Sequence, residues 1–295
     1  MAMTVTVPEE IVQSIPPRHP ARLATALHFF PLLVFLIFSM LSPLPADAAD
    51  NLFNSGTAIK GELTRLSGEA AMFLKAPVDP YLAQSAAVAG VFALSYLFDE
   101  DINSELSRSH GRVLRGITDF GNAASNPFLH LGVAAAFYTA GVAADRPRVM
   151  QLGEEMGEAL VLSDAATFVL KGVIGRGRPY SGDGNSRYRP FQFQDGYDSL
   201  PSMHTASSFA MAHVVASKTD SLGAKLACYA TASLAGFSRA YRGKHWASDV
   251  VLGAAIGELA GNTVTRYRAL QPGQLTLAPL SIDGHPSLAL IGKFQ

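Results

Sequence analysis

Charge is what this 295-residue sequence has little of. Charged residues make up 16% of it, and 23 basic side chains are balanced by 24 acidic ones, for a formal net charge of −1. Nucleic-acid-binding proteins carry a basic stripe or patch, so this balance gives no support to that class. Affinity for phosphate would have to be local, built from a few placed cations.

Cysteine is almost absent. Cys228 is the single cysteine, which excludes an internal disulfide, and its apolar surroundings in the run 226–230 favour packing as a small hydrophobic side chain. Export is not excluded, because a secreted protein does not need disulfides.

The N-terminal segment has the pattern of an export signal. Arg18 and Arg22 precede the apolar run 29–38, and Ala46-Asp47-Ala48 then offers the small residues of a cleavage site. We therefore predict a signal peptide over residues 1–48, with an uncleaved membrane anchor as the alternative. Either form places the protein in the periplasm or on the periplasmic face of a membrane.

Helical periodicity dominates the rest of the chain. Two uncharged runs, 82–98 and 128–144, are somewhat short of the roughly 20 residues that a spanning helix needs, which favours buried helices of a bundle and leaves membrane embedding open. Asp79-Pro80 and Asn126-Pro127 are start signals for these two helices. Further helices are predicted over residues 104–117, 154–175, 202–217, 221–237 and 246–266, with a long loop over 176–200.

The alternation that is typical of strands is confined to the tail. There the segments 275–277 and 288–290 flank Asp283-Gly284, which predicts a hairpin. The predicted fold class is therefore all-α, a helical bundle with a small C-terminal β-hairpin. The predicted division is a connector and helix over 49–77, a helical domain over 78–268 and a tail over 269–295.

A histidine, a carboxylate and a cation fall close together late in the chain. His245 lies six residues after Arg239 and four before Asp249. On a helix that begins near residue 245, the carboxylate would share a face with the ring, where it could fix the tautomer and stabilise a positive imidazole. With Arg239 folded back toward the ring, this arrangement suits a tetrahedral oxyanion such as phosphate.

Two more clusters lie where predicted helices end or begin. Lys171 and Arg178 surround a glycine-rich helix end, and Ser202-Met203-His204 starts a helix. The N-terminus of a helix presents unpaired N–H groups and a partial positive charge, which bind phosphate. Ser202 could add its hydroxyl and Met203 its N–H, while His204 beside the anion could be protonated and act as a general acid. The cations would neutralise the transferring group.

Other readings of the histidines carry less weight. His130 and His213 lie on apolar helices, where a core or rim position with satisfied hydrogen bonds is the common role. A metal site built from His204 and His245 is disfavoured, because the surrounding cations would repel a metal ion and favour an anion.

Together the three clusters resemble the three-part signature of the type 2 phosphatidic acid phosphatase (PAP2) superfamily. The matching segments are Lys171-x6-Arg178-Pro179, Pro201-Ser202-Met203-His204 and Ser238-Arg239-x5-His245-x3-Asp249. Three motifs in the right order are far more specific than any one alone. The superfamily also contains bacterial non-specific acid phosphatases, glucose-6-phosphatase and vanadium haloperoxidases, and its α-bundle fits the predicted helices.

The resemblance implies a role for each residue. His245 would attack phosphorus and become a phosphohistidine while Asp249 holds its other nitrogen, and His204 would protonate the leaving alkoxide. The implied phosphate-binding residues are Lys171, Arg178, Ser202, Met203 and Arg239. No metal or cofactor is expected, and vanadate is expected to inhibit. Met203 stands where the family usually has glycine, and its larger side chain would narrow access to the phosphate.

The sequence favours a phosphatase of the cell envelope. It would hydrolyse phosphomonoesters or pyrophosphates without a metal, and the apolar helices favour lipid phosphates as substrates. A soluble, broad-specificity acid phosphatase is the alternative within the same chemistry. From other classes come a vanadium-dependent haloperoxidase, with vanadate as cofactor, and a non-catalytic binding or scaffold module. The expected partner is a phosphorylated small molecule or lipid and not nucleic acid; membrane association and oligomeric state stay open.

Overall fold

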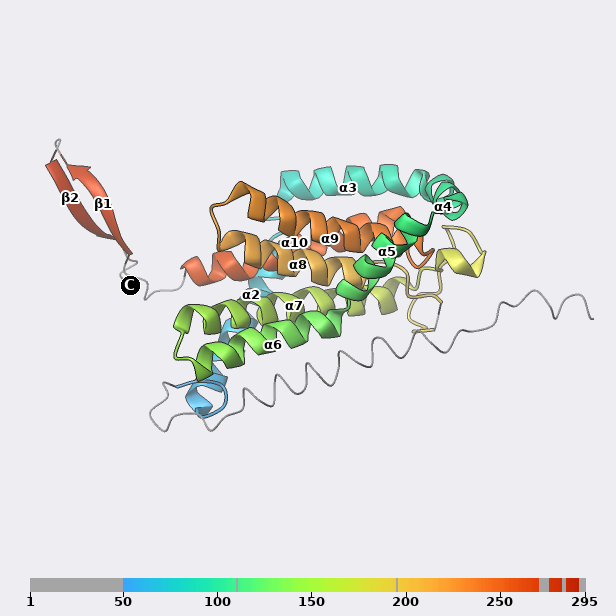
Figure 1. The fold of residues 1–295 in the computed structure, drawn as a ribbon. Helices are drawn as coiled ribbons and strands as arrows, with labels where there is room; N and C mark the ends of the chain where they lie inside the picture. Colours follow the sequence, from blue (N-terminus) through green and yellow to red (C-terminus); the bar gives the residue numbers. More distant parts are fainter. Residues whose placement is uncertain (1–49, 110, 195, 271–275, 283–284, 292–295) are drawn as a thin grey trace, which may run out of the picture. The chain divides into compact units, whose positions relative to one another are not determined.

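The computed structural model describes residues 50–109, 111–194, 196–270, 276–282 and 285–291. The predicted signal peptide or anchor, residues 1–48, lies outside the described residues and stays a prediction, as do the predicted domain boundaries. Most of the described chain is helical, which confirms the predicted all-α class (Figure 1).

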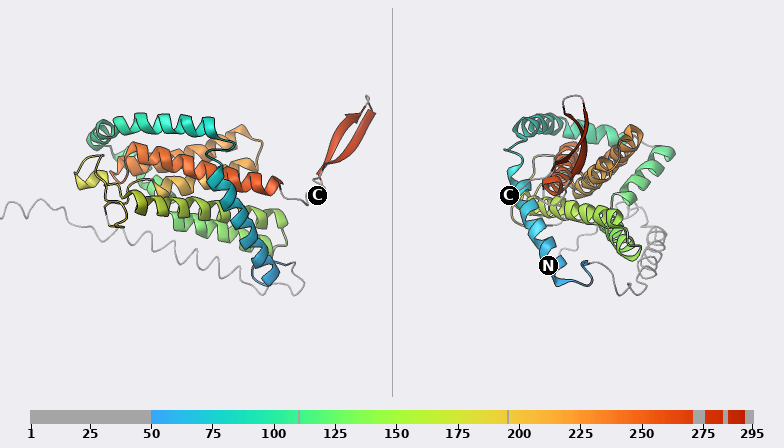
Figure 2. Two further views of the ribbon diagram at one scale, coloured as in Figure 1. Left: turned by 180° about the vertical axis from the view of Figure 1, so that it is seen from behind. Right: turned by 90° about the vertical axis from the view of Figure 1, so that its left-hand side faces the viewer.

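The helices form a bundle. In chain order they are α2 (Gly56–Lys75), α3 (Leu82–Leu97), α4 (Asp99–Arg108), α5 (Arg112–Ala124), α6 (Pro127–Ala143), α7 (Pro147–Ile174), α8 (Met203–Ser217), α9 (Leu222–Tyr241) and α10 (Ala247–Leu270), with a short 3-10 helix, η2 (Pro179–Ser181), after α7. Figure 1 shows most of the long helices running roughly parallel, with α5 crossing them at an angle. In the left view of Figure 2, α2 also runs obliquely across the bundle.

The core lies between α7, α8 and α10. Its side chains recur at intervals of four residues, which places them on one face of each helix. They include Met156 and Leu160 of α7, Ala206, Ala210 and Val214 of α8, and Ile256, Ala260 and Val264 of α10. Small residues allow a close approach, since a Cβ added to Gly253 of α10 would lie 2.5 Å from the carbonyl oxygen of Ser202. The start of α8 is therefore held directly against the early turns of α10.

Proline predicts one helix start correctly and another too early. α6 begins as predicted, because Asn126 caps it by accepting a hydrogen bond from the backbone at 2.9 Å. α3 begins at Leu82, and Pro80 lies in the turn before it. Asp79 does not cap this helix, whose N-cap residue is Tyr81, and its carboxylate forms an ion pair with Lys75 at the end of α2 (2.8 Å).

Two further boundaries differ from the prediction. α7 begins at Pro147, well before residue 154, because proline fits the first position of a helix. The single polar helix predicted over 104–117 is instead the pair α4 and α5. Gly111 has an extended conformation (φ −143°) immediately before α5, which ends the helical path between them.

None of the described helices is by itself long and apolar enough to cross a membrane. α3 and α4 reach that length and apolarity only together, and they are bent by 59° at the break between them. α6, which carries the second uncharged run, is a shorter apolar helix of 17 residues.

The tail forms the predicted hairpin. β1 (Thr276–Ile282) pairs with β2 (His285–Ile291) in antiparallel fashion, with Thr276 opposite Ile291 and Ile282 opposite His285. The residues between the strands, 283–284, lie outside the described residues. The paired strands confirm the small hairpin of the predicted fold class.

Candidate active site

The third motif bends between two helices. Arg239 lies in the last turn of α9, as predicted, and Gly243 takes a left-handed conformation (φ +60°) in the bend that follows. The N–H of Lys244 donates to the carbonyl oxygen of Arg239 at 3.0 Å, which closes the bend. α10 begins only at Ala247, so His245 lies in the bend and not on the helix.

His245 is therefore held differently from the prediction. Its Nδ1 bonds to the carbonyl oxygen of Ser199 at 2.7 Å, whereas the nearest oxygen of the Asp249 carboxylate is 3.7 Å away. The two side chains are within ion-pair distance, but the hydrogen bond goes to Ser199 because His245 precedes α10. Asp249 faces the ring as a nearby negative charge without bonding to its nitrogen.

The bond to Ser199 determines the tautomer of His245. A carbonyl oxygen can only accept, so we infer that Nδ1 carries the hydrogen and that Nε2 keeps its lone pair. Nε2 is then the ring atom that can attack an electrophile. His245 lines a pocket while exposing 2% of its surface, so its ring is well shielded from solvent.

Asp249 organises the start of α10. Its Oδ2 accepts hydrogen bonds from the Trp246 N–H at 2.8 Å, as a carboxylate in the first helical turn can, and from the hydroxyl of Ser199. Its Oδ1 accepts from Arg176 at 2.7 Å. Burial raises the pKa of this carboxyl, and Arg176 with these hydrogen bonds offsets part of the rise. Asp249 thus positions His245 through the Ser199 segment.

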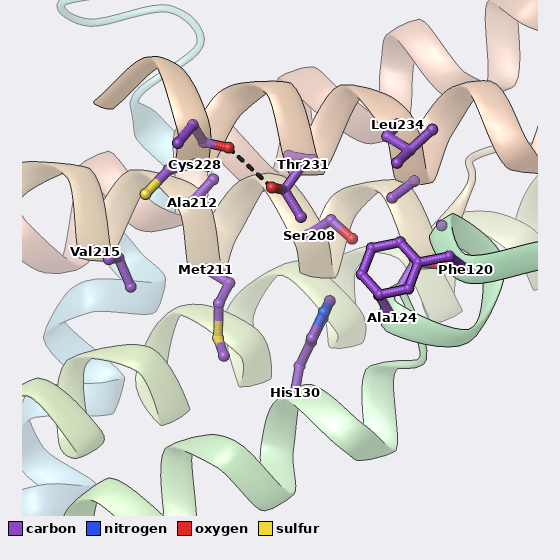
Figure 3. Close-up of a pocket in the computed structure, with 15 residues that line it drawn as sticks. Phe120, Ala124, His130, Ser208, Met211, Ala212, Val215, Cys228, Thr231 and Leu234 are labelled. Atoms are coloured by element: carbon purple, nitrogen blue, oxygen red, sulfur yellow. Dashed lines mark hydrogen bonds between the residues drawn. The ribbon is translucent and has the colours of Figure 1, made fainter. Parts of the chain in front are cut away.

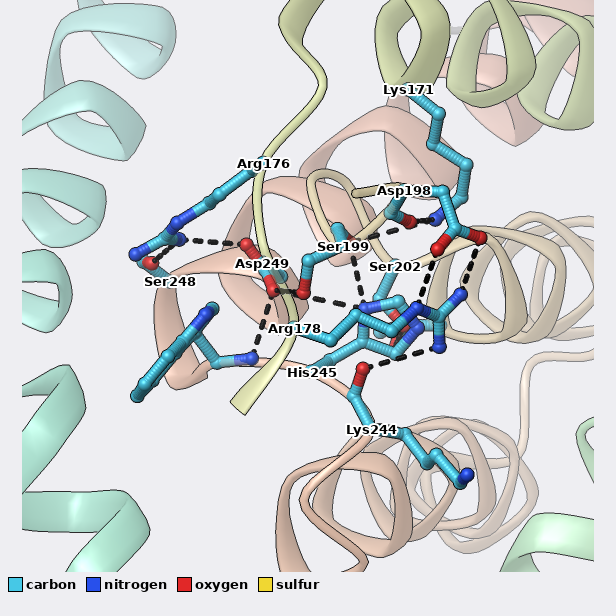
Figure 4. Close-up of polar contacts among 12 residues, drawn as sticks. Lys171, Arg176, Arg178, Asp198, Ser199, Ser202, Lys244, His245, Ser248 and Asp249 are labelled. Carbon is cyan, nitrogen blue, oxygen red and sulfur yellow. Dashed lines mark hydrogen bonds and ion pairs between the residues drawn. The ribbon is translucent and has the colours of Figure 1, made fainter. Parts of the chain in front are cut away.

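Behind the histidine lies a buried ion-pair network that the sequence does not predict. Arg176 is fully buried and donates to Asp99 and to Asp249, each at 2.7 Å. Asp99 also accepts from the backbone N–H of Ser248 at 2.9 Å. Figure 4 shows the Arg176 side chain reaching both Ser248 and Asp249. One arginine shared by two carboxylates closes the back of the site.

No local pattern marks this network. Arg176 enters the core because Gly175, in a left-handed conformation (φ +61°), ends α7 and turns the chain. Asp99 has the pattern of an acidic helix end, yet it begins α4 and bonds to Ser248, 149 positions later. The one sequence signal for this network is that Arg176 lies within the first motif. That position does not identify Asp99 or Asp249 as its ion-pair partners.

In front of His245 lies a pocket of about 460 Å³, which we call the phosphate pocket. It is lined by most of the predicted site residues: Lys171, Arg178, Met203, His204, Arg239 and His245. Asp249 and Ser202 are the two predicted residues that do not line it. The three motifs, far apart along the chain, converge on this one cavity. Among the described residues, no group of three or more histidine, cysteine, aspartate or glutamate side chains is arranged to hold a metal ion.

Three cations face the phosphate pocket with different partners. Arg178 forms a two-fold ion pair with Asp198, at 2.6 and 2.5 Å. Lys171 donates to the backbone carbonyl of Asp198. Arg239 donates through Nη1 to Asn122 at 2.5 Å, while its buried Nε has no hydrogen-bond partner among the described residues. One carboxylate for three cations leaves an excess of positive charge that suits an anion.

The start of α8 differs from the prediction at Ser202. Its hydroxyl accepts from Thr205 at 2.8 Å, and its N–H donates to the carbonyl oxygen of Asp249 at 3.0 Å. Ser202 is fully buried and does not line the pocket, so its predicted contact with phosphate stays a prediction. Met203 and His204 do line the pocket, at the first helical positions, whose N–H groups have no partner within the helix.

The excess of positive charge acts on the titratable groups of the pocket. Burial, then Arg239 and Lys171, lower the pKa of His204 to about 3. Burial, then Lys171 and Arg178, lower the pKa of His245 well below its usual range. Burial and Arg178 also lower the pKa of Lys171 to about 8. Without a bound anion both rings are neutral at pH 7, so the predicted protonation of His204 requires an anion to offset the cations.

The site segment matches a known family. Residues 155–271 match the sequence model of the PAP2 superfamily, and this segment contains all of the predicted site residues. A lipid A 1-phosphatase from Porphyromonas gingivalis is 39% identical over 106 residues, which are 35% of this chain and 22% of the relative. The chain thus spans about a fifth of the length of the curated relative that it matches.

Two solved structures resemble the chain more distantly. The crystal structure of LpxE from Aquifex aeolicus has a TM-score of 0.46 at 20% identity and covers 58% of this chain and 96% of its own. A transmembrane PAP2-type phosphatidylglycerolphosphate phosphatase from Bacillus subtilis has a TM-score of 0.40 at 18% identity and covers 71% of this chain and 95% of its own.

Proposed function

Since residues 155–271 of this chain belong to the PAP2 superfamily, we propose that the protein is a phosphatase that hydrolyses lipid phosphates, as monoesters or pyrophosphates, through a phosphohistidine intermediate. The observation that carries this proposal is the pocket in which two neutral histidines face three cations. A neutral Nε2 is a nucleophile, and an excess of positive charge stabilises a transferring phosphoryl group.

In the first step, the Nε2 lone pair of His245 attacks phosphorus, and the bond between phosphorus and the leaving oxygen breaks. The ring gains positive charge, which the Ser199 carbonyl stabilises through Nδ1–H and Asp249 stabilises from 3.7 Å. His204 gives its proton to the leaving alkoxide, which departs as a neutral alcohol. That proton arrives with the substrate, because the bound anion raises the pKa of His204.

In the second step, a water molecule attacks the phosphorus of the phosphohistidine. His204, now neutral, takes a proton from the water, the bond between nitrogen and phosphorus breaks, and His245 recovers its lone pair. Lys171, Arg178 and Arg239, with the N–H groups of the first turn of α8, hold the phosphoryl oxygens through both steps. Inorganic phosphate then leaves, and both histidines are ready for another cycle.

Lipid phosphates are the proposed substrates because apolar surface adjoins the pocket. Phe168 and Phe193 line it, yet they expose 60% and 67% of their surfaces. Hydrocarbon bound there would cover apolar area that otherwise faces water. The relative from Porphyromonas gingivalis is named a lipid A 1-phosphatase, which supports the same substrate class. We place the reaction in the periplasm or at the periplasmic face of a membrane, reached through the export signal predicted over 1–48.

The proposed reaction does not require a metal ion, because the three cations supply positive charge where it is needed. Phosphate release should therefore survive EDTA. Vanadate should inhibit, because it can adopt the geometry of a phosphoryl group in transfer, and transition-state analogues bind tightly. Dependence on an added divalent metal would contradict the mechanism.

The test is a substrate panel for the purified full-length protein. Phosphatidate and a polyprenyl pyrophosphate should release phosphate faster than a small soluble phosphomonoester. His245→Ala should reduce release to background while the protein keeps its helical circular dichroism. His213→Ala is the matched control, because His213 bonds to Glu258 at 2.8 Å outside the phosphate pocket, and it should keep its activity.

The same assay separates the other functions. Faster turnover of the soluble monoester would favour a broad-specificity acid phosphatase. Vanadate-dependent oxidation of bromide by hydrogen peroxide, without phosphate release, would favour a haloperoxidase. If phosphate release were the same in the unsubstituted protein and in His245→Ala, the activity would come from a contaminant. The protein would then be a non-catalytic binding or scaffold module.

A further inference from the structure

A second pocket, of about 330 Å³, opens between α5, α6, α8 and α9, and we call it the α8–α9 groove. Its walls are largely apolar and include Phe120 of α5, Met211 and Val215 of α8, and Ala232, Leu234 and Ala235 of α9. Figure 3 shows Met211 and His130 pointing into the same space from α8 and α6. Its volume is at the lower end of the range for pockets that hold small ligands.

The α8–α9 groove begins one helical turn from the phosphate pocket. On α8, His204 lines the phosphate pocket and Ser208, four residues later, lines the groove. On α9, Arg239 lines the phosphate pocket and Ala235, four residues earlier, lines the groove. Residues four apart lie on the same face, about 6 Å apart along the helix axis. The groove therefore continues the phosphate pocket along the same faces of both helices.

One polar atom in the α8–α9 groove lacks a partner. His130 exposes 9% of its surface, and its buried Nδ1 has no hydrogen-bond partner within the described part of the chain. Burial lowers the pKa of this ring, and the backbone of Ala124 offsets part of that change, so the ring is neutral. A buried nitrogen without a partner is unfavourable. A hydroxyl group can pair with it in either tautomer, because a hydroxyl both donates and accepts.

We propose that the α8–α9 groove binds one hydrocarbon chain of the substrate, and that a hydroxyl group on this chain pairs with Nδ1 of His130. The identity of the ligand as a substrate rests on the proposed phosphatase function, whereas binding of the chain does not depend on turnover. Apolar walls favour hydrocarbon. In Figure 3 His130 points toward Ser208, which lies one helical turn from His204 on α8, and this places the hydroxyl toward the phosphate end of the chain.

The single cysteine provides a test that needs no phosphatase assay. Cys228 lines the groove, so ligands in the groove should shield its thiol. N-ethylmaleimide should modify Cys228 in the full-length protein, and 1-decanol should slow this reaction in a saturable way. An alkylation rate that 1-decanol does not change would overturn the proposal.

Substitutions at Thr231 test whether 1-decanol protects Cys228 by binding in the α8–α9 groove. Thr231 lines the groove from its exposed side, so a large side chain there fills the groove without entering the core. In Thr231→Trp the alkylation rate should no longer depend on 1-decanol, and in the matched variant Thr231→Ser the dependence should remain. Equal protection by 1-decanol in both variants would place the alcohol elsewhere and overturn the proposal.

A comparison of 1-decanol with decane tests the role of His130. The ratio of their half-protecting concentrations should change by about five- to tenfold between the unsubstituted protein and His130→Leu, because one hydrogen bond to Nδ1 is lost. Comparing ratios cancels the difference in solubility between the two ligands. The same ratio in both proteins would mean that water, and not the ligand, pairs with Nδ1, which would overturn this part.

Kinetics connect the groove to the reaction. Thr231→Trp should raise KM for decyl phosphate and leave KM for ethyl phosphate unchanged. If the unsubstituted protein hydrolyses neither ester, the proposed phosphatase function fails, and the alkylation of Cys228 still decides whether the groove binds a chain. If Thr231→Trp changes KM for both esters equally, the groove is not where the substrate chain lies.

Discussion

Two arginines on opposite sides of His245 have opposite surroundings. Arg176, behind the ring, lies between Asp99 and Asp249, bonds to both at 2.7 Å and is fully buried. Arg239, in front of the ring, has Asn122 as its polar partner and a buried Nε without one. At the back of the site the charge of Arg176 is paired with two carboxylates, whereas the front has positive charge and donors available for a ligand.

The difference indicates that residues behind His245 hold the site in place, whereas residues in front of it are available to bind a ligand. The back determines where His245 lies, since Asp249 holds the start of α10 and the Ser199 segment together. Burial lowers the pKa of both histidines, and the positive charge at the front, which is not neutralised, lowers it further. A phosphate dianion supplies the missing negative charge, so affinity for the ligand and protonation of His204 are coupled.

The largest expected effect, on stability, comes from removing Arg176 from the ion-pair network behind His245. Arg176→Met leaves two fully buried carboxylates without their cation, and loss of one partner from a buried pair costs about 3–5 kcal/mol. Urea denaturation should show this fall in the free energy of unfolding. Arg108→Met, at a side chain that is 74% exposed, is the matched control and should have little effect. Equal stability of the two variants would refute the structural role of the network.

Removal of the front arginine should act on the reaction instead. Arg239→Met should lower kcat/KM by about 10²- to 10³-fold, the usual effect of losing one group that stabilises transferring charge. Its stability should change much less than that of Arg176→Met, because a buried donor without a partner disappears with the side chain. Steady-state kinetics and urea denaturation on the same preparations test both points. A stability loss as large as that of Arg176→Met would show that Arg239 also has a structural role, which contradicts the proposed difference between the two arginines.

The coupling between anion and proton predicts a pH dependence. The pKa of His204 is about 3 without an anion, and a bound dianion raises it. Binding therefore takes up a proton, and the affinity for sulfate should rise as the pH falls, by up to about tenfold per pH unit. Isothermal titration calorimetry in buffers of different ionisation enthalpy measures this uptake. His204→Asn should abolish it, and uptake that persists in this variant would assign the proton to another group.

The smallest effect is expected at Met203, where the family usually has glycine. Met203→Gly should lower stability by about 0.5–1 kcal/mol or less, because glycine has more freedom in the unfolded chain. It should also lower KM for bulky esters relative to small ones, since a side chain that lines the pocket is removed. Met203→Ala is the control for side-chain size. A rise in KM for bulky esters in both variants would mean that methionine contacts the substrate and does not obstruct it.

The parts of the site that local patterns determine could be predicted from the sequence. Arg239 at the end of one helix and His204 at the start of another follow from caps and apolar periodicity, and both line the phosphate pocket. The hydrogen-bond partner of His245 could not be predicted, because it depends on whether α10 begins before or after residue 245. A boundary shift of two residues replaced the expected bond with one to Ser199.

The parts that depend on distant contacts could not be predicted. Asp99 has the pattern of a solvated helix end, and its burial against Arg176 appears only when α4 packs near the start of α10. Ser202 looks exposed at the start of a helix, but the close approach of Gly253 covers it. Neither arrangement leaves a periodic or compositional trace in its own segment.

The bond between Asp99 and Ser248 joins positions that are 149 residues apart. Contacts between such distant positions form late, because the loop that they close must first lose its conformational freedom. The position of His245 therefore depends on contacts that close a long loop, between α4 and the start of α10. The proposed activity would therefore require the assembled bundle, because no single segment of the chain contains this arrangement by itself.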